Sequence, residues 1–304
     1  MAAILLTACS GGPPAVTNPI QTPSRIAPAL VQVENDPQSH PQYGLQRADL
    51  VYEYLTEGGI TRFTLIYFNP QGGDRVEPVR SARLITLRLQ KIYQGVLVYS
   101  GASSKVQGLI NDQHLPAVDE NAQGVFSRDS SRPAPHNLMT TLDQIRQAVQ
   151  QKGVRVTYEL PKHGEPTAKG EPAAKIAFQQ TNRHNVTYTY APTEQQYAYS
   201  YEGGSLTDAG DANKQVMVTN VVLIRVPHHG AGYTEDVVGS EGIDFDLDAS
   251  GPAELYTRGQ HFSARWDVTN GPLRLLDAAG KPIAMPDGLT WLHLVDPDMQ
   301  VQAS

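Results

Sequence analysis

The chain has 304 residues, of which 40% are hydrophobic and 18% are charged, and its formal net charge is −7. This composition is that of a globular chain long enough for two domains of ordinary size, and it excludes an intrinsically disordered protein. The negative charge also argues against nucleic acid as a partner, because nucleic-acid binding usually needs a basic surface.

The single cysteine, Cys9, follows the apolar stretch Ala2–Leu5 and the residues Leu6-Thr7-Ala8. An apolar residue, two small residues and a cysteine form the lipobox of bacterial lipoprotein precursors, in which the cysteine is acylated. The alternative is a chance cysteine, since the preceding segment lacks Lys and Arg and is shorter than a usual signal. We expect a palmitate-bearing lipid anchor at Cys9, an extracytoplasmic position on the cell membrane, and a signal remnant and Pro-rich tether over residues 1–28.

Residues 29–160 are predicted to form a mixed α/β domain, because β-rich runs alternate with stretches of helical periodicity. The Gly-rich segment 57–61 indicates a hairpin. Thr141 begins a pattern like a capping box, and Gly153 ends the helix that follows it. The expected strands lie at 30–33, 50–55, 63–68 and 95–100, and the expected helices begin at Ser81, Ser104 and Thr141.

The stretch 161–172 is rich in Pro, Gly, Lys and Glu and is the expected boundary between two domains. Beyond it, residues 173–304 contain short strands separated by turns, which predicts a smaller β-rich domain resembling a sandwich or barrel. The expected fold class is therefore α+β. The predicted strands of this domain lie at 186–190, 196–201, 215–226, 243–247, 254–257, 273–276 and 290–295.

The first of two polar clusters is Pro78–Arg83. Ser81 is a good N-cap residue, and Arg80 and Arg83 flank the helix start that it would create. Free backbone N–H groups, the helix dipole and two guanidinium groups would together bind an anion. The alternative is a capped helix whose arginines pair with surface carboxylates.

The second cluster lies in the proline-rich loop 126–137. A loop with so many hydrogen-bond donors is more typical of a binding site than of a simple connection. His136 is the candidate acid or base, and Asp129 or Asp112 would orient it. The alternative is a loop held by its own Arg–Asp pairs, with His136 capping the next helix. The arginine, aspartate, histidine and asparagine residues of this loop are Arg128, Asp129, Arg132, His136 and Asn137.

A nucleophilic triad of Ser81, His136 and one of the two aspartates is disfavoured. The chain has no Gly-x-Ser-x-Gly motif, and the oxygen of an N-capping serine is occupied by helix amides. Metal ligation is also disfavoured, because the available groups lack the spacing that metals favour, and no metal or cofactor is expected. Those groups are His228-His229, and His184 with Asp244, Asp246 and Asp248.

Several further runs are distinctive: Val33–Pro37, Pro41–Leu45, Ala48–Glu53, Glu57–Arg62, Ala134–Leu138, Asn220–Val222, Trp266 and Gly288–Trp291. Together with Pro78–Arg83 they resemble the YerB-type bacterial lipoproteins, a two-part family of unknown function. The resemblance implies an envelope lipoprotein with an α/β first part and a β-rich second part, and it implies no reaction. Asp36 and His40 stand where family members commonly carry His and Arg, which leaves the role of the loop 35–41 open.

These features predict a lipid-anchored binding or accessory protein with an Arg-rich cleft for an anionic envelope ligand, such as a glycan or a peptide stem. One alternative is an envelope hydrolase or lyase that uses His136 with Asp129 or Asp112. Another is an interaction scaffold whose β domain docks a membrane-protein partner. The expected ligand-binding residues are Arg80, Ser81, Arg83, Arg128, Arg132, His136 and Asn137.

Overall fold

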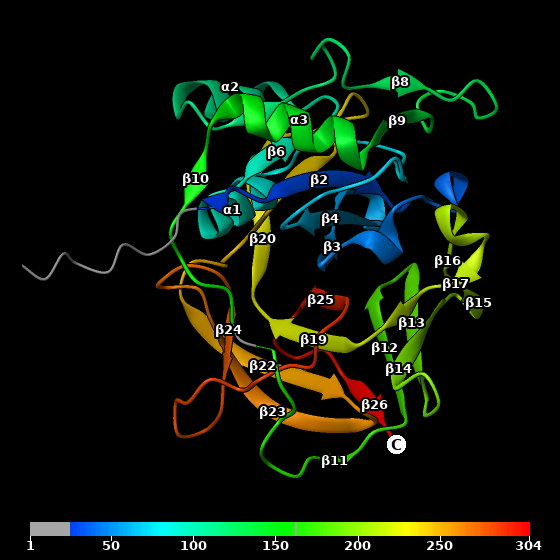
Figure 1. Ribbon diagram of the computed structural model, residues 1–304, viewed down its shortest axis with the longest axis vertical. Coiled ribbons are helices and arrows are strands. Elements are labelled where there is room, and N and C mark those ends of the chain that lie inside the picture. Colours follow the sequence, from blue (N-terminus) through cyan, green and yellow to red (C-terminus); the bar gives the residue numbers. More distant parts are fainter. Residues whose placement is uncertain (1–24, 162) are drawn as a thin grey trace, which may run out of the picture.

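The computed structural model describes residues 25–161 and 163–304. The predicted lipidation site Cys9 and most of the predicted tether lie outside these residues. Within the described part, no helix combines the length and the hydropathy needed to cross a bilayer. The helices gather at one end of the molecule and strands of the second part at the other (Figure 1).

Three long strands form the centre of the first part: β2 (Ala29–Glu34), β3 (Leu50–Leu55) and β4 (Thr61–Tyr67). Both β2 and β3 pair antiparallel with β4. The predicted hairpin is confirmed, with a turn over Glu57–Gly59 in which Gly58 has a φ of 74°. All residues of β2 and β4 are buried, because the sheet is covered on both faces.

Two short parallel strands extend this sheet beyond β2: β6 (Val96–Val98) and then β7 (Ala117–Val118) at the edge. Helix α2 (Ser104–Asp112) connects β6 to β7. It packs with α1 (Leu84–Tyr93) on one face of the sheet, and α3 (Leu142–Lys152) packs on the other. The predicted capping box at Thr141 and the helix end at Gly153 are confirmed.

Short strands complete the first part. A two-stranded sheet joins β1 (Arg25–Ile26) to β10 (Arg155–Val156). The strand β9 (Leu138–Thr141) pairs antiparallel with both β5 (Arg75–Val76) and β8 (Ser127–Arg128). The second polar cluster therefore begins in β8 and ends just before β9.

The central sheet continues from the first part into the second. The strand β25 (Thr290–Val295) pairs parallel with β3 on one side and with β19 (Asn220–Arg225) on the other. The resulting eleven-stranded sheet contains strands from both parts of the chain. Its outer strands in the second part are β22 (Ser250–Thr257), β23 (Gln260–Asp267), β24 (Arg274–Leu276) and β11 (Glu171–Pro172).

A six-stranded sheet forms the other layer of the second part. The ring of Tyr199 in this sheet lies 4.9 Å from that of Trp291 in the large sheet. The second part is thus β-rich and layered like a sandwich, as predicted. The strands of the smaller sheet are β12 (Lys175–Thr181), β13 (His184–Ala191), β14 (Gln196–Tyr201), β15 (Gly204–Ser205), β18 (Met217–Val218) and β26 (Val301–Ala303).

The prediction of one strand over 215–226 is wrong. The chain changes sheets there, since β18 pairs with β14 in the small sheet and β19 pairs with β22 and β25 in the large one. A single straight strand cannot pair with both sheets. The two remaining hairpins are β16 (Thr207–Asp208) with β17 (Lys214–Gln215), and β20 (His228–Thr234) with β21 (Glu241–Phe245).

Candidate functional site

The candidate site lies where the parallel strands of the first part end. Glu34 is the last residue of β2, Ser100 and Gly101 follow β6, and Glu120 follows β7. Because parallel strands end at the same edge of a sheet, these residues share one edge, which is the usual ligand position in such sheets. The extended segment 80–82 lies along it, since the carbonyl of Arg80 accepts a hydrogen bond from the N–H of Ser100 at 2.9 Å.

The two polar clusters meet at the carboxylate of Glu34. Arg80 Nε lies 3.1 Å from Glu34 Oε1, and His136 Nδ1 lies 2.7 Å from Glu34 Oε2. The side chain of Glu34 is only 4% exposed, so both contacts are largely shielded from water. Arg80 Nη1 also donates to the carbonyl of Pro135 at 3.3 Å. One buried carboxylate thus fixes a guanidinium from one segment and an imidazole from another.

The expected orientation of His136 by Asp129 or Asp112 is wrong. Glu34 orients this ring, while Asp129 contacts Arg75 at 2.6 Å and Asp112 is the last residue of α2. His136 also precedes a strand, so it does not cap a helix. Glu34 was not among the predicted site residues. Its signal in the sequence was a carboxylate at the end of a strand that is apolar except for Gln32.

Arg128 reaches the same edge from β8. Its Nη1 donates to Asn137 Oδ1 at 2.9 Å, and its Nη2 lies 3.9 Å from Glu120 Oε2. Ser100 Oγ donates to that same oxygen of Glu120 at 2.8 Å. The side chain of Arg128 is 52% exposed and that of Arg80 is 24% exposed. These two guanidinium groups are therefore within reach of a ligand from solvent.

Ser81 does not cap a helix, contrary to the prediction. Helix α1 begins at Leu84, and its N-cap is Arg83, whose N–H donates to Thr86 Oγ1 at 2.6 Å. The segment 80–82 is extended because it pairs with the backbone of Ser100 and Gly101. The predicted anion site at a helix start beside Ser81 is therefore absent, although Ser81 itself remains half-buried at the strand ends.

Arg83 belongs to a buried ionic network. Its Nε lies 2.8 Å from Glu57 Oε1, and its Nη1 lies 3.3 Å from Glu235 Oε1. Burial opposes the charge of Arg83, but the hydrogen bonds and charge of Glu57, together with Glu235, raise its pKa overall. Because Glu235 follows β20, this network ties the first part to the second. It matches the alternative in which the arginine pairs with carboxylates.

Arg132 holds the loop 37–43 against the proline-rich loop, and Asp129 pairs with Arg75 of β5. Arg132 donates to the carbonyls of Ser39 at 3.1 Å and Pro41 at 2.5 Å, and its guanidinium lies 5.2 Å from the ring centre of Tyr43. Hydrogen bonds from Ser131 and from Arg75 lower the pKa of Asp129 to about 2. The alternative of a loop held by its own Arg–Asp pairs is therefore wrong, because Asp129 pairs with Arg75 outside the loop and Arg132 binds carbonyl groups.

A buried arginine that the sequence analysis missed lies beneath this edge. Arg62 Nη1 donates to the carbonyl of Ser81 at 3.0 Å, whereas Arg62 Nε has no hydrogen-bond partner among the described residues. Burial and the neighbouring charge of Arg83 lower the pKa of Arg62 to about 10. Arg62 is also close enough to Arg80 for that charge to oppose its own. The sequence offered only an arginine in an apolar strand as a signal.

A second buried network joins the two parts around Glu53. The carboxylate of Glu53 is fully buried and lies 2.7 Å from His184 Nε2. It accepts hydrogen bonds from Tyr199 and Trp291 at 2.9 and 2.8 Å. Burial alone would raise the pKa of Glu53, but the charges of His184 and His293 and the hydrogen bonds from His184 and Thr61 outweigh it and lower the pKa to about 2. His184 therefore has a structural partner of its own.

The other groups considered for metal binding are also engaged in pairs. Arg88 binds Asp244 through two hydrogen bonds of 2.7 Å. His228 Nδ1 lies 2.7 Å from Asp296 Oδ1, and His229 Nδ1 lies 3.7 Å from Asp246 Oδ1. These contacts spread the groups over several separate pairs.

Comparison with known proteins supports one family. Residues 16–155 match the model of the DUF3048 N-terminal domain and residues 174–292 that of its C-terminal domain, both described as of unknown function. The chain is 30% identical over 283 residues to the Bacillus subtilis (strain 168) protein named "Putative lipoprotein YerB", covering 90% of this chain and 82% of that one. The crystal structure of YerB from Bacillus subtilis matches with a TM-score of 0.75 and 27% identity, covering 94% of this chain and 97% of that one.

Proposed function

We propose that this chain, which belongs to the family of proteins with DUF3048 N- and C-terminal domains, is a lipid-anchored binding protein of the cell envelope whose ligand carries an anionic group. The lipobox ending in Cys9 and the lipoprotein name of the relative support the anchoring. The cluster around Glu34 supports the binding role.

One observation supports the proposal. Two segments more than 40 residues apart bring Arg80 and Arg128 to the edge of the sheet at which the parallel strands β2, β6 and β7 end. Their guanidinium groups are part-exposed, and Glu34, Glu120 and Asn137 fix their positions. A prearranged guanidinium forms strong, charge-assisted hydrogen bonds with carboxylate or phosphate oxygens. The unpartnered Nε of the buried Arg62 below adds positive potential to the same place.

The proposed site is smaller than the set predicted from sequence. Arg83 and Arg132 are bound to carboxylates and carbonyls of the protein, so they support the site and do not contact the ligand. The ligand contacts would come from Arg80, Ser81, Arg128 and His136. Carboxylates or phosphates of envelope glycans, and carboxylates of peptide stems, have the matching chemistry.

The test is a titration of the purified full chain with inorganic phosphate and, separately, with acetate. Replacing Arg80 and Arg128 together by Ala should weaken binding by about tenfold or more, since two charge-assisted contacts are lost. The melting temperature should stay close to that of the unaltered chain. Arg265→Ala, an exposed arginine of the second part, is the control and should bind normally. Unchanged binding combined with a clear drop in melting temperature would instead assign both arginines to a structural network.

A second candidate function rests on the contact between His136 and Glu34. An imidazole oriented by a buried carboxylate is the usual arrangement of a general base, so the chain would be an envelope hydrolase or lyase. Incubation with purified peptidoglycan distinguishes the two functions. Release of soluble fragments that His136→Gln abolishes would favour the enzyme, and binding without release would favour the binding protein.

A further inference from the structure

We infer that the open cleft between α2 and α3 binds an extended peptide segment of a protein, which adds as a strand to the edge strand β7. The cleft has a volume of about 850 Å³ and contains Ala117 and Val118 of β7 in its lining. Its lining does not include Arg80 or Arg128, so the inference goes beyond the proposed anion site.

The backbone of β7 has hydrogen-bonding groups that its neighbour in the sheet does not use. In the parallel pairing with β6, the N–H of Leu97 donates to the carbonyl of Pro116 at 2.9 Å, and that of Tyr99 donates to the carbonyl of Val118 at 3.1 Å. Because successive residues of a strand point their backbone groups to opposite sides, the N–H and C=O of Ala117 face away from β6. An unpaired strand edge of this kind is a template for another strand.

The cleft has apolar side chains on both faces of the sheet, against which the side chains of an added strand would rest. Ile110, Val118, Val125 and Ala148 line it and are at most 9% exposed. Ile110 of α2 belongs to the core on one face, and Val118, Val125 and Ala148 belong to the core on the other. Successive side chains of an extended peptide would therefore point alternately to these two faces.

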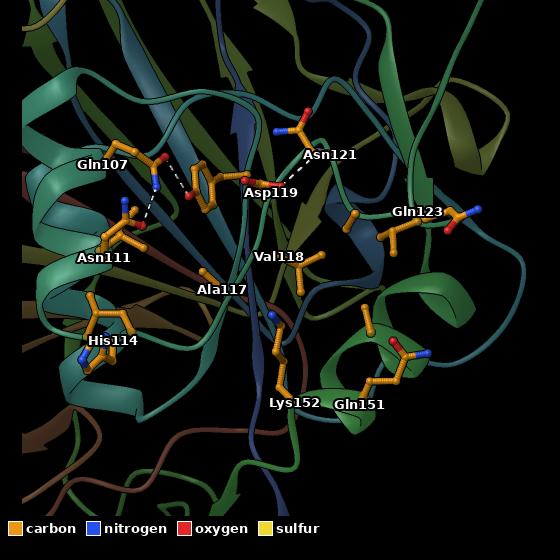
Figure 2. A pocket seen from close by; sticks show the side chains of 16 residues that line it. Gln107, Asn111, His114, Ala117, Val118, Asp119, Asn121, Gln123, Gln151 and Lys152 are labelled. Carbon is orange, nitrogen blue, oxygen red and sulfur yellow. Dashed lines mark hydrogen bonds between the residues drawn. The ribbon is translucent and has the colours of Figure 1, made fainter.

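Primary amides dominate the rim, as the side chains drawn around β7 show (Figure 2). An amide can both donate and accept, as a peptide group does, and so fits a neutral backbone. Tyr99 Oη donates to Gln107 Oε1 at 3.0 Å, and Gln107 Nε2 donates to Asn111 Oδ1 at 3.1 Å, which holds two of these amides in place. The rim amides are Gln107, Asn111, Asn121, Gln123 and Gln151.

The charges of the lining are balanced, with Lys152 set against Asp119. A cleft for a nucleic acid or an anionic polymer would need several cations, whereas an uncharged peptide backbone needs none. The added strand would exchange its two closest hydrogen bonds with Ala117. Its contacts would therefore depend on backbone N–H groups more than on side-chain charge.

The probe for this site is acetyl-tetra-L-alanine amide, titrated into the full chain and followed by the backbone amide signals in NMR spectra. The signals of Ala117, Asp119 and Gln151 should shift in a saturable manner. The same peptide methylated on every backbone nitrogen should cause no such shift, because neither of its edges then has an N–H to donate to β7. Shifts with both peptides, or with neither, would overturn the inference.

Two substitutions test the site independently of the probe. Ala117→Pro removes the N–H that faces the cleft and should weaken binding at least fivefold, with little change in melting temperature because proline is tolerated at strand edges. Gln151→Trp should fill the cleft and also block binding, whereas Gln150→Trp, exposed on the same helix outside the cleft, should not. Equal binding by the two tryptophan variants would contradict the inference. Replacing Arg80 and Arg128 should leave peptide binding intact, which separates this site from the anion site.

Discussion

At the scale of single residues, the site depends on the charge of Glu34. Its two oxygens contact Arg80 and His136, and its side chain is almost completely buried. Burying a carboxylate costs free energy, which its contacts with two partners offset. Removing its charge would leave the charge of Arg80 partly buried without a counter-ion. The predicted site residues Arg80 and His136 are thus held in position by Glu34, which was not among the predicted residues.

Glu34→Gln tests this role, because it keeps the shape of the side chain and removes its charge. We expect the free energy of unfolding to fall by about 2 kcal/mol, measured by urea denaturation. The control is Glu120→Gln, whose carboxylate is 36% exposed and lies 3.9 Å from Arg128. The control substitution should lower the free energy of unfolding by less than about 1 kcal/mol, because exposed ion pairs contribute little to stability. Equal losses in the two variants would show that Glu34 has no special position.

The buried network around Glu53 predicts how stability depends on pH. Burial lowers the pKa of His293 from 6.5 to about 4. The charges of His184 and His293, with hydrogen bonds from His184 and Thr61, lower the pKa of Glu53 from 4.5 to about 2 despite its burial. Both pKa values lie below those of the unfolded chain, so the unfolded chain binds more protons as the pH falls. The contribution of His293 is complete above pH 6.5 and is lost as the pH falls towards 4, and that of Glu53 is lost between 4.5 and 2.

The melting temperature should therefore fall steadily from pH 7 to pH 4. The fully buried His293 contributes on the order of 3 kcal/mol to this change. His293→Gln should reduce the slope between pH 6.5 and 4, whatever its melting temperature at pH 7. Part of the slope should remain, because burial also lowers the pKa of His40 to about 4. His229→Gln, at an exposed position, should keep the slope of the unaltered chain. An unchanged slope in His293→Gln would refute the assignment.

At the scale of elements, the sequence predicted most strands and helices of the first part, because their periodicity and capping residues are local. Thr141 and Gly153 bound α3 as expected, and the Gly-rich turn joins β3 to β4. The start of α1 was predicted wrongly. Ser81 is a residue type that favours the N-cap position, but its neighbours Arg80 and Ala82 are hydrogen-bonded to the residues after β6. That pairing depends on tertiary contacts, which local patterns do not contain.

The candidate site was predicted in part for the same reason. The sequence identified both polar clusters, because donors concentrate there in an otherwise acidic chain. It did not separate Arg80 and Arg128, which remain accessible, from Arg83 and Arg132, which are bound internally. Their partners Glu57, Ser39 and Pro41 are more than 20 residues away in the chain. Composition alone cannot assign such pairs.

The connection between the two parts also gives a prediction at this scale. Segment 161–172 is pinned at several points: the N–H of Gly164 donates to the carbonyl of Met285 at 2.9 Å, and Glu165 pairs with Arg258 at 2.7 Å. Exposed Pro- and Gly-rich segments are nevertheless preferred sites of proteolysis. Limited trypsin digestion should therefore cut first within 161–172, at Lys162 or Lys169. Earlier cleavage inside 29–153 would contradict this boundary.

The two fragments should remain associated after that cut. The strand β25 of the second part pairs along its length with β3 of the first, and Arg83 and Glu53 form buried contacts across the same junction. Gel filtration of the cut chain should show one species with the size of the intact chain. Separate fragments in solution would show that the junction is weak.

At the scale of the whole molecule, one eleven-stranded sheet runs through both parts. At the end of the sheet that belongs to the first part, the carboxyl ends of the parallel strands form the proposed anion site. The strand β7 is the last of the sheet there and has no further strand beside it among the described residues. The two proposed sites therefore lie on the first part, while the second part extends and braces the same sheet. The sequence did not predict this continuity, because β3 and β25 are about 240 residues apart.

Whether Arg80 and Arg128 hold an anion is tested most directly by following the arginine Nε–H signals in NMR spectra while inorganic phosphate is added to the full chain. We predict saturable shifts of the Arg80 and Arg128 signals, with the signals of Arg83 and Arg132 unchanged because the protein already binds those side chains. If phosphate shifts neither Arg80 nor Arg128, or shifts them no more than the exposed Arg265, the two arginines do not form a ligand site.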